Sequence, residues 1–237
     1  MPPLRAVAGL ARYAALVDPV AGTPPAWTRG LLRCGVAAGP IFVAVFLVEG
    51  AVREGYCPLR HPVSALALGP RGWIQVANFT VAGTLFLAGA AGLRRAGDAA
   101  GSAAPALIGA AGAGLIAAAV FPTDPVSGYP PGAPDALDRP SRAGIAHNLA
   151  AVPVFLGLPA AAVCSGWRFW WAGQHRFGLY SAGSGVAMLG SMILAGAGFG
   201  QSPRLVGLAG LLQRVSIITG FGWLTALSAR VLRREVP

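Results

Sequence analysis

The chain has 237 residues, a mean hydropathy of +0.62, 55% hydrophobic residues and 11% charged residues. Soluble domains carry about 25% charged residues, so this composition excludes an ordinary water-soluble protein and predicts an integral membrane protein. All 18 basic residues are arginine, and they stand singly or in pairs at the edges of apolar segments. Orientation signals of membrane proteins are placed in this way. Nucleic acid binding needs a basic face instead, and we expect none.

Residues 1–29 precede the first long apolar segment and are expected to be cytoplasmic. Arg5 and Arg12 interrupt an apolar stretch there, which argues against a signal peptide. Because these two arginines are seven residues apart, they share one face of a helix. The pattern predicts an interfacial helix that lies on the membrane, with a disordered tail as the alternative.

Residues 30–237 contain six apolar segments, at about 31–52, 73–93, 103–121, 145–167, 177–200 and 205–229. Each is long enough to cross the roughly 30 Å hydrocarbon core of a bilayer as a helix. None shows the alternation of a membrane strand. The predicted fold class is therefore all-α, a polytopic integral membrane bundle of six transmembrane helices. The many glycines of the third, fifth and sixth segments predict close helix packing.

The arginines predict the orientation of the bundle. With six spans, both termini lie on one side, and that side holds eleven arginines against six on the other, with Arg214 inside the last segment. The positive-inside rule then places both termini in the cytoplasm of a multi-pass cell membrane protein.

The remaining polar residues gather on the side opposite the termini. They lie near the outer ends of the apolar segments or in the outer loops: Glu49, Arg60, His61, Gln75, Asn78, Asp124, His147, Gln213 and Arg214. The cytoplasmic ends carry few polar residues other than arginine. The asymmetry predicts a polar pocket in the extracytoplasmic half of the bundle.

Arg214 is the most costly of these residues, since a charge at membrane depth costs about 2.5–3.5 kcal/mol on insertion scales. Arginine does not lose its proton in proteins, so we expect Arg214 to face the bundle and to meet an acid. Glu49 is the preferred partner because it also lies inside a span, and Asp124 is the second candidate. The alternative for Glu49 is a helical pair with Arg53, four residues away.

We assign candidate catalytic roles to Asp124, His147, Glu49 and His61, and candidate ligand-binding roles to Arg60, Gln75, Asn78, Gln213 and Arg214. Each has a structural alternative, such as a turn or cap for Asp124 and a ring bonded to a carbonyl for His147. The two histidines and two carboxylates leave zinc open, but no local ligand motif supports it, so we expect neither metal nor cofactor. A Ser64-based hydrolase lacks a nucleophile elbow.

Three stretches carry a family resemblance: RHPVSALALG at residues 60–69, GWIQVANF at 72–79 and FPTDP at 121–125. Together with GIAHN at 144–148 and Gln213-Arg214, they resemble a family of bacterial six-span membrane proteins filed as domain of unknown function 998. The resemblance extends from about residue 31 to the end of the chain. It implies the six-span architecture but no reaction.

Two functions are compatible with these residues. The first is an acid–base enzyme acting on a lipid-like or isoprenoid substrate, such as a membrane terpene cyclase. Asp124 or Glu49 would supply a proton, His147 or His61 would act as the base, and aromatic rings would shield a cation: Trp73, Phe79, Phe121 and Phe155. The alternative is a non-catalytic transporter, sensor or lipid-binding protein in which Arg60 and Arg214 hold an anionic head group. The expected partners are membrane lipids or a hydrophobic small molecule; protein partners stay open.

Overall fold

The computed structural model describes residues 25–97 and 103–234, and these form an all-α bundle. The long helices are α2 (Ala26–Val52), α3 (Gly72–Arg95), α4 (Ala104–Val120), α7 (His175–Phe199) and α8 (Ala209–Arg234). The remaining rod is continuous and consists of α5 (Arg142–Val152), the π-helical turn η2 (Pro153–Gly157) and α6 (Leu158–Trp171). Two short 3₁₀ helices, η1 (Val63–Ala67) and η3 (Val206–Leu208), lie in loops.

The rods have the length and composition of membrane spans. Five of them are long and apolar enough to cross a bilayer. The sixth, α4, is apolar but has only 17 residues, the lower end of the usual range for a span. The predicted all-α bundle of six helices is confirmed, and the protein is a multi-pass membrane protein.

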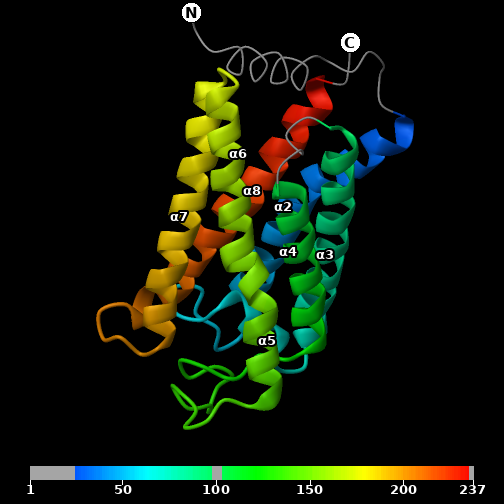
Figure 1. The fold of residues 1–237 in the computed structure, drawn as a ribbon. Helices are drawn as coiled ribbons and strands as arrows, with labels where there is room; N and C mark the ends of the chain where they lie inside the picture. The colour runs from blue at the N-terminus through cyan, green and yellow to red at the C-terminus, as the bar shows by residue number, and fades with distance from the viewer. Residues whose placement is uncertain (1–24, 98–102, 235–237) are drawn as a thin grey trace, which may run out of the picture.

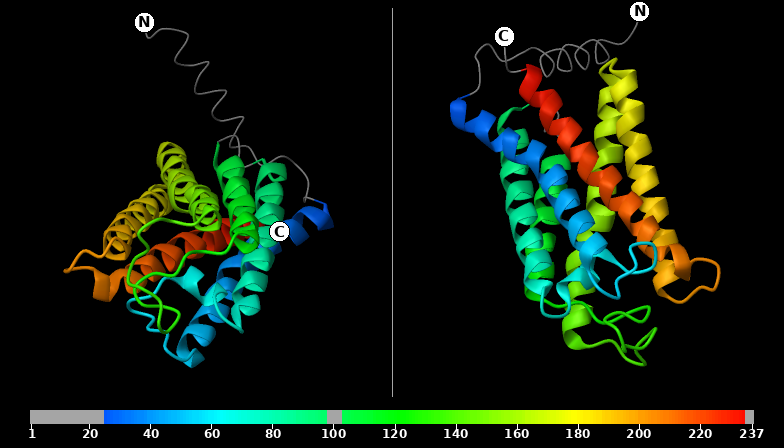
Figure 2. Two further views of the ribbon diagram at one scale, coloured as in Figure 1. Left: turned by 90° about the horizontal axis from the view of Figure 1, so that it is seen from below. Right: turned by 180° about the vertical axis from the view of Figure 1, so that it is seen from behind.

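The start of α2 and the end of α8 lie at the same end of the bundle (Figure 1). The opposite end carries the connections 53–71, 121–141 and 200–208, and is called the loop end below (Figure 2). The predicted interfacial helix, in the apolar stretch 4–17, lies outside the described residues. The end of the segment 1–29 was expected to link this helix to the first span, but α2 begins at Ala26 and continues into the span.

Glycines bring several helix pairs into backbone contact. A Cβ atom at Gly83 of α3 would lie 2.6 Å from the carbonyl oxygen of Gly112 in α4. One at Gly166 of α6 would lie 2.7 Å from a backbone nitrogen of α7. Packing therefore explains many of the glycines, as predicted, but not all of those in the fifth and sixth segments. Gly183 and Gly190 have no atom within 4 Å of such a Cβ.

Pro40 interrupts the hydrogen bonding of α2, and α8 compensates for it. A proline in a helix has no N–H to donate to the carbonyl four residues earlier, which here is that of Val36. The Thr225 hydroxyl of α8 donates to this carbonyl oxygen at 3.1 Å. The two helices approach closely at this point, because a Cβ at the neighbouring Gly39 would lie 2.8 Å from the carbonyl oxygen of Phe221.

The bundle has a core rich in phenylalanine and outer faces that expose large apolar side chains. The interior contains Phe42 and Phe46 of α2, Phe86 of α3, and Phe221 and Trp223 of α8, all fully buried. The outer faces carry large exposed aliphatic residues, among them Leu47, Val48, Leu149, Leu156, Leu179, Val186 and Ile193. In a membrane these outward side chains contact lipid and need no protein partner.

Candidate functional site

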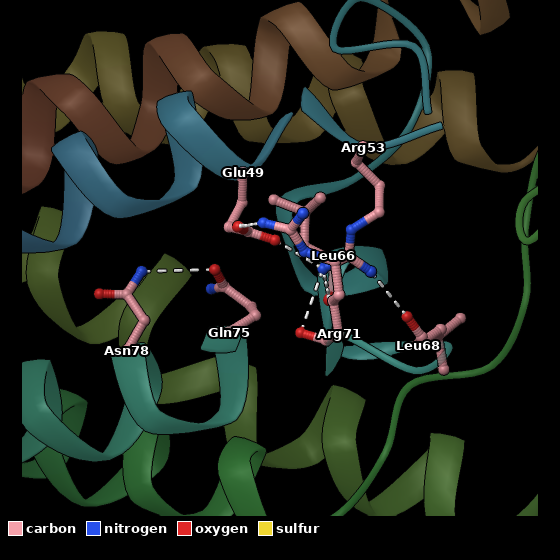
Figure 3. A network of polar contacts seen from close by, with 7 residues as sticks. All are labelled: Glu49, Arg53, Leu66, Leu68, Arg71, Gln75 and Asn78. Carbon is pink, nitrogen blue, oxygen red and sulfur yellow. Dashed lines mark hydrogen bonds and ion pairs between the residues drawn. The ribbon is translucent and has the colours of Figure 1, made fainter. Parts of the chain in front are cut away.

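Glu49, near the end of α2, holds the beginning of the first connection (Figure 3). Its carboxylate pairs with Arg53 at 2.8 Å and with Arg71. Arg53 also donates to the carbonyl oxygens of Leu66 and Leu68, at 3.2 and 3.0 Å. The pair with Arg53 is the helical pair predicted as the alternative for Glu49. The acid and its two arginines thus fasten the connection 53–71 to both helices that it joins.

Gln75 and Asn78 lie one helical turn apart on α3, beside this cluster (Figure 3). Asn78 donates to the carbonyl oxygen of Phe42 at 3.1 Å and to the Gln75 side-chain oxygen at 3.3 Å. Both side chains are buried. Through these contacts the two residues join α3 to α2. Neither lines the cavity described below.

Arg214 does not pair with Glu49, and this prediction was wrong. Its Nη1 atom lies within hydrogen-bonding distance of the carbonyl oxygens of His61 and Gly210, at 3.1 and 2.9 Å, and of Pro58. Its Nη2 atom donates to the Tyr56 hydroxyl. Among the described residues, no carboxylate lies within ion-pair distance of it. The charge is stabilised by backbone dipoles and a phenol, since carbonyl groups are strong acceptors.

The start of α8 fixes the first connection at two further points. The Gln213 side-chain oxygen accepts the backbone N–H of Val63 at 2.8 Å, and the Leu211 N–H donates to the Leu59 carbonyl oxygen at 3.0 Å. Gly210 permits this approach, because a Cβ there would lie 2.5 Å from the carbonyl oxygen of His61. Gln213 and Arg214 thus hold the connection 53–71 against the start of α8, and Gln213 also lines the cavity.

His61 joins the first connection to the segment 121–141. Its Nδ1 atom accepts the backbone N–H of Cys57 at 2.9 Å, so its Nε2 atom carries the proton and donates to the Ser127 carbonyl oxygen at 3.1 Å. Burial lowers the pKa of His61, and the charges of Arg60 and Arg214 lower it further, against the opposing effect of the bond to Ser127. Both ring nitrogens are occupied, and His61 does not line the cavity.

Two more contacts hold the segment 121–141 at the loop end. Arg60 pairs with Asp135 at 2.6 Å, in an exposed position. Gln201 donates to the Asp135 carbonyl oxygen at 2.9 Å and to the Ser127 hydroxyl at 3.3 Å. Ser127 and Gln201 both have positive φ angles, 57° and 64°, which residues other than glycine rarely adopt. The segment is therefore pinned by both neighbouring connections and crosses the loop end (Figure 2).

A cavity of about 550 Å³ lies beneath this segment. Its volume is within the range of about 300–1,000 Å³ that is typical of small-molecule sites. The walls include five phenylalanines and several aliphatic residues: Phe42, Phe79, Phe155, Phe199, Phe221, Leu115, Ile217 and Met192. The polar lining residues are Ser64, Thr123, Asp124, His147, Asn148 and Gln213. Of the nine candidate site residues, three line this one cavity: Asp124, His147 and Gln213.

His147 and Asp124 are the two candidate catalytic residues that line this cavity. His147 is buried, and its Nδ1 atom lies 2.8 Å from the Phe121 carbonyl oxygen, which can only accept. Nδ1 therefore carries a proton, and in the neutral ring the Nε2 atom is left as an acceptor with no protein hydrogen-bond partner among the described residues. Asp124 accepts the backbone N–H of Ser141 at 2.9 Å, at the start of α5. No hydrogen bond joins Asp124 to His147 in the described part of the chain.

Sequence reasoning missed the π-helical turn and several cavity walls. Pro153 begins the turn, and Val154, Phe155 and Leu156 within it line the cavity. Such turns often occur at functional sites. A proline inside an apolar segment was the available signal. Of the four rings predicted to shield a cation, Phe79 and Phe155 line the cavity, whereas Trp73 and Phe121 do not.

Comparison with known families agrees with the resemblance drawn from the sequence. The family model described as "Protein of unknown function (DUF998)" matches residues 36–230. That range extends from within α2 to within α8 and so includes every residue of the cavity lining. No curated protein and no solved structure matches the chain.

Proposed function

We propose that this chain, which belongs to the DUF998 family of unknown function, binds a lipid-like or isoprenoid molecule in the cavity and carries out acid–base chemistry on it. The observation that carries the proposal is the His147 ring. Its Nδ1–H is committed to the Phe121 carbonyl, and its Nε2 remains available inside an apolar cavity. A base is positioned in this way in many active sites, by a carbonyl or carboxylate on the other ring nitrogen.

The position of the cavity supports an apolar ligand. Val152 and Leu156 line it and are also 45% and 55% exposed on the outer face of the α5–η2–α6 rod. α5 packs against α4, whereas no comparable packing joins it to α7 or α8. An apolar chain can therefore enter sideways from the bilayer, while residues of the segment 121–141 line the cavity at the loop end.

One specific reaction is proton-initiated rearrangement, as in a terpene cyclase. The protonated form of Asp124 would deliver a proton to an alkene or epoxide, and the carboxylate would be left behind. The faces of Phe42, Phe79 and Phe221 would stabilise the resulting cation, and His147 Nε2 would remove a proton to end the reaction. The proton gained equals the proton lost, so no cofactor is needed for the isomerisation. Glu49 and His61 take no part in this form of the mechanism, because they lie outside the cavity lining.

Non-catalytic lipid binding or transport is the second candidate. It is favoured by the separate hydrogen bonds of the two polar residues, since Asp124 holds the start of α5 and His147 holds the end of α4. In that function both residues would shape the cavity, and their bonds to the backbone would be their whole role.

We further propose that the loop end is extracytoplasmic in the cell membrane, on the arginine balance. Cys57 lies exposed at the loop end, and Cys34 and Cys164 lie towards the other end. A membrane-impermeant thiol reagent added to intact cells should label Cys57 alone. Labelling of Cys164 would contradict the orientation.

The function is tested by lipid capture and conversion. The full chain, reconstituted in nanodiscs, is incubated with the lipid extract of its host membrane and with linear isoprenoid alcohols and epoxides, and products are followed by mass spectrometry. Wild type should retain a lipid and convert it, whereas His147→Ala should retain it unchanged. Ala151→Trp, which fills the cavity, should retain none, and Ala160→Trp on an exposed face of α6 is its matched control. Retention without conversion by wild type would support the second candidate, and equal retention by both Trp variants would contradict the site.

A further inference from the structure

The polar end of the cavity has acceptors and no fixed cation. Among the residues that line it, Asp124 is the one carboxylate, and no arginine is present. In the neutral ring, His147 presents its Nε2 lone pair, because Nδ1 donates to the Phe121 carbonyl oxygen. The other polar lining groups are the hydroxyls and amides of Ser64, Thr123, Asn148 and Gln213, all uncharged.

The two arginines predicted to bind an anion are committed elsewhere. Arg214 is 5% exposed and is directed at loop carbonyl groups and at Tyr56. Arg60 is paired with Asp135 on the outside of the segment 121–141. The expectation that Arg60 and Arg214 hold an anionic head group therefore has no geometric support. A phosphate at the polar end of the cavity would lie close to the half-buried carboxylate of Asp124, and like charges at short distance repel each other.

We propose that the ligand carries an uncharged hydrogen-bond donor, a hydroxyl, at its polar end, and that phosphate- and diphosphate-headed lipids are rejected. This inference rests on the proposed function, because it assigns the head group of the same ligand. The hydroxyl donates to His147 Nε2 or to Asp124, and its lone pairs accept from an amide such as that of Gln213. The Gln213 oxygen is already used by Val63 N–H, which leaves its nitrogen to donate. The apolar chain lies along the phenylalanine walls.

Three photoactivatable probes with the same sixteen-carbon diazirine chain test the inference. They end in a hydroxyl, in its methyl ether or in a phosphate, and are added to the full chain in phosphatidylcholine nanodiscs. Crosslinked peptides are quantified by mass spectrometry. The alcohol should label cavity residues roughly tenfold or more above the phosphate, because of the charge of Asp124, and several-fold above the ether, which cannot donate.

Two variants make the comparison specific. Asp124→Asn removes the charge and should narrow the preference for alcohol over phosphate. Asp138→Asn, an exposed acid of the same segment outside the cavity lining, is the matched control and should leave it unchanged. Labelling by phosphate equal to that by alcohol in wild type would overturn the rejection of anions, and equal labelling by alcohol and ether would overturn the donor requirement. If none of the probes labels the cavity, the proposed function fails and this inference with it.

Discussion

Arg214 of α8 donates a hydrogen bond to the Tyr56 hydroxyl, and so a charge inside the last span is balanced by a connection between the first two helices. The Tyr56 hydroxyl in turn donates a hydrogen bond to the Pro62 carbonyl oxygen at 3.0 Å. Burial raises the pKa of Tyr56 to about 12, although the nearby Arg214 opposes this shift. The phenol therefore keeps its proton, and among the described residues Arg214 is held by neutral groups, which include the rings of Phe46 and Tyr56.

Replacing Arg214 with Leu should destabilise the protein by roughly 3 kcal/mol or more, since several buried acceptors lose a charged donor at once. The carbonyl groups of Pro58 and His61 would be left without it. Unfolding by sodium dodecyl sulfate in mixed micelles measures the loss. Arg204→Leu, at an exposed position of the third outer connection, is the control and should change little.

The double variant Glu49→Leu with Arg214→Leu separates this arrangement from a direct pair. Glu49 is bonded to Arg53 and Arg71, so the two losses should add. A double variant markedly more stable than the sum of the single losses would show that the acid and Arg214 do interact.

His61 should make folding stability depend on pH. Its pKa is lowered in the folded state by burial, so the folded protein favours the neutral ring. The stabilisation is fully present above the unfolded pKa of about 6.5 and is lost as pH falls through the folded pKa. The charged and titratable groups around the ring are Arg60, Arg214, Tyr56 and Tyr129.

We expect the melting temperature in detergent to fall between pH 7.5 and pH 5, because a protonated ring loses the bond from the Cys57 N–H. His61→Gln keeps an acceptor and a donor but does not titrate in this range, so it should flatten the dependence. An equally steep fall in this variant would assign the effect to another group.

The helices could be predicted from the sequence because they depend on runs of apolar residues, which are local. The start of α2 at Ala26 could not, since Pro24 and Pro25 predict a link there and the continuous apolar run begins only at about Leu31. The π-helical turn could not be predicted either, because a proline inside an apolar segment signals an irregular helix but does not specify its type.

The candidate site was predicted in part, and the errors have one physical origin. The positions of the polar residues along the apolar segments predicted a pocket at the end of the bundle opposite the termini. His147 and Asp124 do share a cavity at this end. The partner of Arg214 was not predicted, because carbonyl groups are present at every residue and carry no signal in the sequence. Only the path of the connection 53–71 brings them to the arginine.

Thr225 should be worth about 0.6–1 kcal/mol to the bundle, the usual size of an interhelical hydrogen bond in a membrane protein. Thr225→Val keeps the shape but removes the donor to the Val36 carbonyl oxygen. In a Pro40→Ala background, residue 40 regains an N–H that can bond this carbonyl, so Thr225→Val should cost less. The double-mutant cycle, read from steric trapping or detergent unfolding, should show this coupling. Equal costs in both backgrounds would contradict the compensation of Pro40 by Thr225.

The last prediction concerns Gly144, which allows the carboxylate of Asp124 to lie against the first turn of α5. A Cβ at Gly144 would lie 2.0 Å from Asp124 Oδ2, the atom that accepts the Ser141 N–H. Gly144→Ala should therefore displace the carboxylate and cost about 1–3 kcal/mol, the usual penalty of overpacking. It should also weaken lipid retention in nanodiscs. Gly190→Ala is the matched control, because no atom lies within 4 Å of its Cβ and alanine favours a helix over glycine. Adding Asp124→Ala to Gly144→Ala removes the clash, so the double variant should lose less stability than the sum of the two single changes. Strictly additive losses would mean that the backbone at residue 144, and not the carboxylate beside it, requires glycine.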